Sequence, residues 1–276
     1  MSFDVVPAHD IPLEQQASIA NRAFAGYVGG WTELNAETLA RFLLLQGADL
    51  FYSRFVREPN GLVGFGYINR TGDIARLSGM AIEPAARGNG AAAHLLLHLV
   101  EEARARGDRA MMLEVIEQNP RGHRFYLRHG FREIGRLLGW RSHSDGPEET
   151  KSKVQTEEIS ILDVLKLPIA VDYPTLPWQI SRHAIAKLQS ARGFRAGDAY
   201  VIISDPNISP IRVHSFLSAC IDRQSFRNAL AGVMQRFPGR EFFTPAIFPE
   251  EYGTEVFQPL GFRPEPLSQF LMRLDL

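Results

Sequence analysis

Apolar residues recur along the first half of the chain with two different periods. Spacings of three and four residues predict helices, and short apolar runs that end at turn residues predict strands. The helices predicted in this way span residues 11–27, 37–48, 90–107 and 120–129. The predicted strands span residues 3–8, 51–58, 61–69, 74–83, 109–117 and 131–140. Three of these strands follow one another with only turn residues between them, which predicts an antiparallel meander before the long helix.

The helix over residues 90–107 has the clearest pattern. One stripe at helical spacing is expected to be buried: Ala92, Leu96, Leu99, Val100 and Ala103. Glu102 and Arg106 are one turn apart, which predicts an ion pair on the helix surface. Gly107 is expected to end the helix.

The second half repeats this order of elements with a weaker pattern. The polar stretch 143–158 is interpreted as a linker between domains 1–142 and 159–276. Beyond it we predict helices within 175–189 and over 223–237, and strands over 198–205, 210–221, 240–248 and 266–276. Gly-Phe pairs at 130–131 and 261–262 occupy corresponding places in the two halves, which indicates a weak internal repeat.

Composition narrows the functional classes without choosing one. The chain has 276 residues, 45% of them hydrophobic and 22% charged, with a formal net charge of −1. This balance gives no overall attraction to nucleic acid or to an anionic membrane, so neither is an expected partner. The single cysteine, Cys220, cannot form an intramolecular disulfide, and no zinc-binding pattern surrounds it. Without a membrane-spanning apolar segment or a signal-peptide pattern, we expect a soluble cytoplasmic protein.

The stretch EPAARGNGAAA, residues 83–93, fits two phosphate-binding patterns. Its part GNGAAA matches G-x-G-x-x-A, which holds dinucleotides, and its part RGNGAA matches R-x-x-G-x-A, which holds the pyrophosphate of coenzyme A. A dinucleotide turn follows directly on a buried parallel strand. Here the residues after Ile82 separate Gly88 from the apolar run, and the strands before it are predicted to be antiparallel. Asp108 has the spacing of a ribose-binding carboxylate but follows a helix, so the dinucleotide interpretation is the weaker one.

The coenzyme A pattern fits the predicted local structure. The loop precedes the long helix, whose first turn has unpaired amides and the positive end of the helix dipole. Gly88 and Gly90 lack the Cβ atoms that would keep a phosphate away from the backbone. Arg87 adds a charged donor. The sequence therefore predicts a diphosphate-binding loop built mainly from backbone.

Two segments resemble the motifs of one family. Residues 78–107 resemble motif A of the GNAT superfamily of acetyl-CoA-dependent N-acetyltransferases. The family pattern R/Q-x-x-G-x-G/A is met by Arg87, Gly90 and Ala92. Residues 113–131 resemble motif B in the form L-E-V-x-x-x-N…Y-x-x-x-G-F. The resemblance covers roughly residues 1–142 and implies a mixed α/β GNAT fold, which the repeated element order extends to two tandem copies.

The resemblance also implies how acetyl-CoA, the acyl donor, would bind. In GNAT domains two adjacent parallel strands splay apart, and here these would be 74–83 and 109–117. The pantetheine arm would pair with the backbone of the first strand, and loop amides would hold the pyrophosphate. The residues implied are Met80, Ala81 and Ile82 for the arm, and Arg87, Gly88, Asn89, Gly90, Ala91, Ala92 and Ala93 for the pyrophosphate. Asn119 would contact the pantetheine or orient the next helix. No metal is expected.

Acetyl transfer requires a neutral amine, a donor for the developing oxyanion and a proton for the leaving thiolate. By resemblance, Tyr126 would lie near the sulfur as general acid; the alternative is a packed aromatic side chain. Glu114 of the Leu-Glu-Val motif would be the base, with apolar neighbours that strengthen it, or else a structural carboxylate at the splay. Glu83, Glu117 and a chain of water molecules are the other candidates for the base.

The second half departs from the family pattern. Residues 218–223, at the position of the glycine loop, contain no glycine, and the tyrosine position holds Phe257. This half is expected to bind no acetyl-CoA and to run no chemistry. We interpret the chain as an acyltransferase for a primary amine on a small molecule or peptide, acting as a monomer or homodimer. A non-catalytic acyl-CoA sensor is the alternative. Tyr27 and Trp31 either line the acceptor site or belong to the core.

Overall fold

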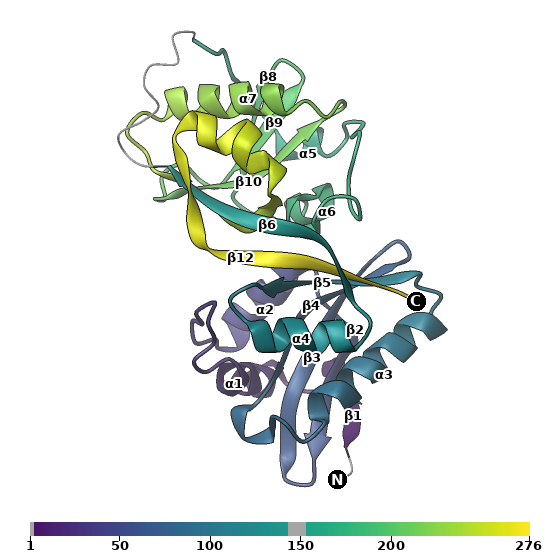
Figure 1. The fold of residues 1–276 in the computed structure, drawn as a ribbon. Coiled ribbons are helices and arrows are strands. Elements are labelled where there is room, and N and C mark those ends of the chain that lie inside the picture. The colour runs from purple at the N-terminus through teal and green to yellow at the C-terminus, as the bar shows by residue number, and fades with distance from the viewer. Residues whose placement is uncertain (1–2, 143–152) are drawn as a thin grey trace. The chain divides into compact units, whose positions relative to one another are not determined.

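The computed structural model describes residues 3–142 and 153–276 (Figure 1). The chain divides into two compact units. The N-terminal unit runs to Ile134 and includes Leu271–Leu276, and the C-terminal unit comprises Gly135–Phe270. Their boundaries lie inside two strands, β6 (Arg132–Ser142) and β12 (Phe262–Asp275). Of the predicted linker, residues 143–152 lie outside the described residues, and Glu157 already begins strand β7.

The N-terminal unit is built on a mixed sheet with the strand order β1-β2-β3-β4-β5. These strands are Asp4–Pro7, Asp49–Glu58, Gly61–Thr71, Ile74–Ile82 and Ala110–Ile116. The helices are α1 (Leu13–Ala23), α2 (Ala36–Gln46), α3 (Ala91–Ala105) and α4 (Pro120–Arg128), with single turns η1 (Ala8–Asp10) and η2 (Pro84–Ala86). Neighbouring strands are antiparallel except β4 and β5, which are parallel. The predicted meander over β2, β3 and β4 is confirmed.

Helices cover both faces of this sheet. α1 and α2 pack on one face, over the buried rings of Phe55, Phe65 and Tyr67. α3 covers the other face so closely that a Cβ on Gly66 would lie 2.6 Å from Leu99 Cδ1. The α3 stripe is buried as predicted at Leu96, Leu99, Val100 and Ala103, and half-buried at Ala92. This packing fixes the start of α3 at the end of β4.

The sheet of the C-terminal unit has the order β6-β11-β10-β9-β8-β7. Its further strands are β7 (Glu157–Ile159), β8 (Arg192–Ala196), β9 (Ala199–Ile203), β10 (Ile211–Ser218) and β11 (Phe242–Pro249). The helices are α5 (Ile161–Val164), α6 (Arg182–Ile185) and α7 (Arg223–Arg236), with short turns η3 (Trp178–Ile180), η4 (Gly253–Phe257) and η5 (Gln258–Leu260). Here β10 and β11 are the parallel pair. α7 packs over an aromatic core that includes Phe216, Phe226, Phe248 and Phe257.

The sequence predicted the C-terminal unit less completely. The helix expected within 175–189 is only the two short pieces η3 and α6, which begin after Pro177 and at the cap residue Ser181. Strands β7 and β8 were not predicted. Each has one large apolar residue, Ile159 and Phe194, so no local pattern marks them as strands. They form because β8 pairs with β9 and β7 pairs with β8.

The two units repeat one arrangement. In each, two antiparallel strands are followed by a long helix and by a third strand that pairs in parallel with the second. These elements are β3, β4, α3 and β5 in the N-terminal unit, and β9, β10, α7 and β11 in the C-terminal unit. The weak repeat in the sequence is therefore a repeat of structure.

Candidate functional site

The glycine loop lies between η2 and α3, and its backbone requires glycine. Gly88 has φ +88° and Gly90 has φ +101°, in the left-handed region that side chains with a Cβ adopt at a cost. Around Gly88 no heavy atom lies within 4 Å of the position a Cβ would take. The loop therefore needs glycine for its conformation, and the space beside Gly88 is open.

The first turn of α3 presents backbone amides at this loop. In the described part of the chain, no acceptor is found for the amides of Ala92 and Ala93, as expected for the first turn of a helix. The amide of Ala91 differs, because Asn89 Oδ1 accepts its hydrogen at 3.1 Å. Asn89 Nδ2 in turn donates to Glu58 Oε1 at 2.5 Å. Asn89 thus shapes the loop with its side chain, and the amide of Ala91 is already engaged.

Arg87 does not point freely toward the loop opening. Its Nε donates to the carbonyl of Ile82 at 2.9 Å, and one Nη donates to the carbonyl of Ala23 at 2.8 Å. These bonds join the loop to the ends of β4 and α1. Through these contacts Arg87 holds the loop in place, and its role as a direct phosphate donor stays a prediction. Glu83, a weaker candidate for the base, forms an ion pair with Arg22 at 2.8 Å.

Beside the loop, the two parallel strands separate as predicted. The β4–β5 ladder runs from Ile74 opposite Ala110 to Leu77 opposite Leu113 and ends there. β4 continues to Ile82, with Met80, Ala81 and Ile82 paired only to β3. On the side toward β5, the backbone of this segment has no strand partner among the described residues. That open backbone edge leads directly to the glycine loop.

A buried ion pair marks the point where the strands separate. Arg76 on β4 donates to both carboxylate oxygens of Glu114 on β5, with Nε at 3.1 and 3.0 Å and Nη2 at 2.7 Å. The side chains are only 2% and 5% exposed. Gln46 Oε1, at the end of α2, also accepts from Arg76 at 3.3 Å. The sequence predicted apolar neighbours for Glu114, and the structure adds the guanidinium of Arg76 on the same face of the sheet.

Tyr126, Asn119 and Tyr27 form a cluster at the end of β5. Asn119 caps α4 by accepting from the amide of Gly122 at 3.1 Å, and its side chain also bonds Tyr27. Burial raises the pKa of Tyr126 well above its ordinary value, and the neighbouring Tyr27 raises it further. Burial also raises the pKa of Tyr27, although the bond to Asn119 opposes this. Tyr126 therefore keeps its proton at neutral and moderately alkaline pH.

The loop after α1 lies against this cluster. A Cβ on Gly29 would come within 2.5 Å of Ile116 Cδ1 and 3.0 Å of the Tyr27 ring. Trp31, in contrast, stacks on Phe24 with ring centroids 4.4 Å apart and donates from Nε1 to Asn21 at 2.9 Å. Of the two aromatic residues left open by the sequence, Tyr27 borders the Tyr126 cluster and Trp31 belongs to the helical layer.

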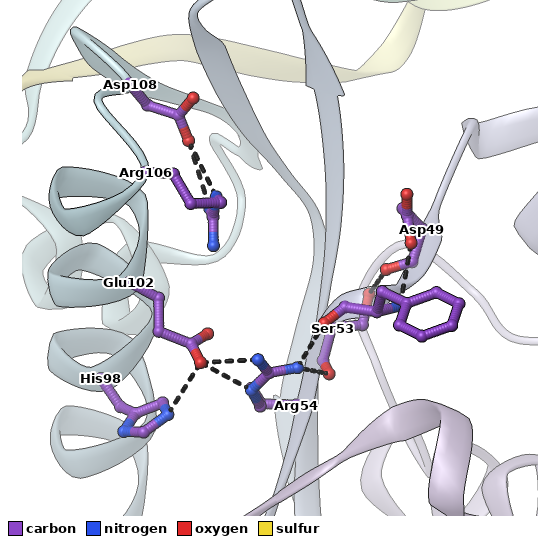
Figure 2. Close-up of polar contacts among 8 residues, drawn as sticks. Asp49, Ser53, Arg54, His98, Glu102, Arg106 and Asp108 are labelled. Carbon is purple, nitrogen blue, oxygen red and sulfur yellow. Dashed lines mark hydrogen bonds and ion pairs between the residues drawn. The ribbon is translucent and has the colours of Figure 1, made fainter.

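Ion pairs on α3 and just beyond its end bear on two further residues of the sequence analysis, Asp108 and Glu102 (Figure 2). Asp108, at the spacing of a ribose-binding carboxylate, is buried and bonds Arg70 at 2.6 Å and Arg106 at 3.2 Å. It is therefore not exposed to a dinucleotide. Glu102 pairs with Arg54 on β2 at 2.6 Å, so the predicted Glu102–Arg106 pair is wrong. Arg106 turns toward Asp108 because the chain bends back at Gly107.

The C-terminal unit lacks the corresponding cradle. Asp222 caps α7 and accepts from the amide of Gln224 at 3.0 Å and from Ser225 Oγ at 2.5 Å. These bonds, that of Ser225 foremost, lower the pKa of Asp222, which places a carboxylate at the start of α7. Phe257, at the tyrosine position, is buried and stacks on Trp140 with centroids 5.7 Å apart. No phenol and no open glycine loop occur at these positions.

Sequence comparison agrees with the N-terminal geometry. Residues 17–131 match the model of the Acetyltransferase (GNAT) family. The N-terminal unit is a GNAT domain. No curated protein sequence matches the chain. Among the described residues, no helix combines the length and apolar character needed to cross a membrane.

Solved structures extend the likeness over both units. A GCN5-related N-acetyltransferase from Anabaena variabilis has a TM-score of 0.65 at 15% identity, covering 99% of this chain and 72% of its own. A tandem GNAT protein from the clavulanic acid biosynthesis pathway has a TM-score of 0.62 at 15% identity, covering 99% and 98%. A GCN5-related N-acetyltransferase from Kribbella flavida has a TM-score of 0.60 at 13% identity, covering 100% of this chain and 71% of its own. At these identities the likeness shows the fold alone, two units of the GNAT fold in tandem.

Proposed function

We propose that the GNAT domain transfers an acetyl group from acetyl-CoA directly to a primary amine, with donor and acceptor bound together. The observation that supports this most strongly is the glycine loop at the start of α3, beside the open edge of β4. A helix start with unpaired amides favours a phosphate, and an open strand edge accepts an extended arm with amide groups. Coenzyme A carries both parts in one molecule.

The residues present fit this donor. The amides of Ala92 and Ala93, together with the space beside Gly88, would hold the pyrophosphate. The backbone of Met80 to Ile82 would pair with the pantetheine arm. Asn119 would act through α4, whose start it caps. In this assignment Arg87, Asn89 and Ala91 shape the loop.

Tyr126 is the proposed proton donor. The amine nitrogen attacks the thioester carbonyl carbon, the carbon–sulfur bond breaks, and the nitrogen loses a proton while the thiolate gains one. Because Tyr126 remains protonated, its hydroxyl has a proton to donate at working pH. Its position beside Tyr27, which contacts Asn119 after the end of β5, supports this role.

Glu114 keeps two candidate roles, base and positioning residue, and its contacts favour the second. Protonating Glu114 would weaken the three hydrogen bonds that it accepts from the buried Arg76 and remove the negative charge of this ion pair. A chain of water molecules would then carry the proton from the amine. Glu114→Gln separates the two roles. If Glu114 is the base, the variant loses the acidic limb of the pH profile of kcat/KM. If Glu114 is a positioning residue, the variant keeps that limb and its KM for acetyl-CoA changes.

The acceptor is proposed only as a class, a primary amine on a small molecule or a peptide. The loop of Gly26 to Gly30, which packs against β5 next to Tyr126, is the part of the N-terminal unit placed to border it. A panel of small amines and N-terminal peptides, assayed by release of the free thiol, would name the class.

Isothermal titration with acetyl-CoA tests the proposal. Wild-type protein should bind, and Gly90→Glu should abolish binding by placing a carboxylate in the cradle and straining the backbone. Gly135→Glu is the matched control, since nothing lies within 4 Å of its Cβ position and it lies outside the loop. Absence of binding by the wild type, or binding that survives Gly90→Glu, would overturn the assignment. Binding without thiol release for any amine would favour the sensor.

A further inference from the structure

The same position in the two parallel strand pairs is occupied by arginine. In the N-terminal unit, Arg76 of β4 lies opposite Met112 of β5. In the C-terminal unit, Arg212 of β10 lies opposite Phe243 of β11. Each arginine points away from the face that its long helix covers, because its strand neighbours pack there. Arg76 and Arg212 are therefore structural equivalents.

The two arginines differ in what neutralises them. Glu114, two residues beyond Met112, binds Arg76. The residue two positions beyond Phe243 is Pro245, which has no charge to offer. Among residues 3–142 and 153–276, the side chain of Arg212 has no hydrogen bond or ion pair, and its Nε is buried. A buried N–H group without an acceptor is costly, so the unpartnered Nε of Arg212 favours an anion beside it.

Carboxylates on the neighbouring strands are already engaged elsewhere. Arg141 of β6, which stacks over the ring of Phe243 at 4.5 Å, binds Glu265 at 2.7 Å and Glu241 at 3.0 Å. The bond to Glu265, followed by that to Glu241, raises the pKa of Arg141. Burial instead lowers the pKa of Arg212. Glu241 and Glu265 are therefore already paired with Arg141.

The surroundings of Arg212 supply further donors for an anion. His214, two residues along β10, is largely buried, and burial lowers its pKa to about 3, with the charge of Arg212 adding to this. It is therefore neutral at physiological pH and carries one N–H donor. η3 covers the same part of the strand, since Ser215 Oγ donates to the carbonyl of Ile180 at 2.5 Å. Arg212 and His214 thus both lie within the C-terminal unit. Both carry N–H groups that can donate to an anion, and neither is acidic.

We propose that the C-terminal unit binds a small oxyanion, a carboxylate or a phosphate group, at Arg212 and His214. The anion takes the place that Glu114 holds beside Arg76. Arginine binds either oxyanion through two parallel N–H groups, so the shared chemistry is that of a planar or tetrahedral oxygen anion. This site is separate from the acetyl-CoA loop and does not depend on the proposed reaction.

Titration of the full chain with sodium phosphate and with sodium malonate tests the site. The Gly90→Glu background removes phosphate binding by the N-terminal loop, and sodium chloride at equal ionic strength controls for screening. We expect saturable binding of at least one anion, and Arg212→Met should weaken it about tenfold or more. Arg263→Met, an exposed arginine of the same unit, should leave it unchanged. Preference for phosphate or for malonate identifies which oxyanion the site selects.

A second variant tests the anion site while leaving Arg212 in place. Pro245→Glu would supply a carboxylate where the N-terminal unit has Glu114, and should abolish binding of both anions while the protein stays folded by circular dichroism. Two results would overturn the proposal: no saturable binding beyond the chloride control, or equal affinity in the wild type and in Pro245→Glu.

Discussion

The two parallel strand pairs show what one topology does with different residues at one point. In the N-terminal unit, the Arg76–Glu114 pair lies where β4 and β5 begin to separate. Beyond that point β4 continues toward the glycine loop. In the C-terminal unit, the equivalent Arg212 has no such partner, and Asp222 occupies the helix start. The fold therefore supplies the place, and a few side chains decide which anion can bind there.

The largest effect is expected from breaking the N-terminal pair. Glu114→Leu removes the carboxylate that binds the buried Arg76 and should cost about 3–5 kcal/mol of unfolding free energy. Adding Arg76→Met should recover most of this loss. Urea unfolding followed at Trp31 reports on the N-terminal unit, and Trp140 and Trp178 report on the other. A cost below about 1 kcal/mol for Glu114→Leu would mean that the pair contributes little to the splay.

The next effect concerns the proton donor. Tyr126→Phe should lower kcat about a hundredfold, the smaller end of general acid catalysis, and leave acetyl-CoA affinity nearly unchanged. Phe257→Tyr is the matched change in the C-terminal unit. It should give no turnover in a Gly90→Glu background, because Asp222 remains at the helix start. An unchanged rate for Tyr126→Phe would remove this residue as the acid.

A moderate effect should appear with pH in the C-terminal unit. The folded-state pKa of His214 is depressed to about 3 from 6.5. The unfolded chain therefore binds more protons between these values, and stability is present above pH 6.5 and is lost as pH falls toward 3. His214→Gln should reduce this loss by about 1 kcal/mol per pH unit. Unfolding curves from pH 7 to 4.5 measure the difference, and identical slopes would contradict it.

The sequence predicted the parts of the site that depend on backbone. Gly88, Gly90 and the start of α3 were found because glycine and helix periodicity are local signals. The end of the β4–β5 ladder also followed, through the resemblance of the motifs around it. These features are encoded within a short stretch of chain.

Side-chain partners from distant elements were not predicted. Arg76 binds Glu114 across two strands, and Arg87 reaches the carbonyl of Ala23 at the end of α1. Nothing in the spacing of these residues marks them as partners, because the sheet register and helix docking bring them together. The same reason left the place of Tyr27 open, because its contact with Asn119 and Tyr126 depends on how the loop after α1 packs.

The smallest expected effect sharpens the comparison of the two helix starts. Gly88→Ala meets no steric clash but places a Cβ on a left-handed backbone, which should cost about 1–2 kcal/mol. Part of this cost should appear as weaker acetyl-CoA binding, by less than tenfold, in titration. The converse change, Ala219→Gly in the segment between β10 and α7, should create no acetyl-CoA binding, since Asp222 at the start of α7 repels a phosphate. Unaltered affinity and stability in Gly88→Ala would show that the loop does not need the left-handed conformation at this residue.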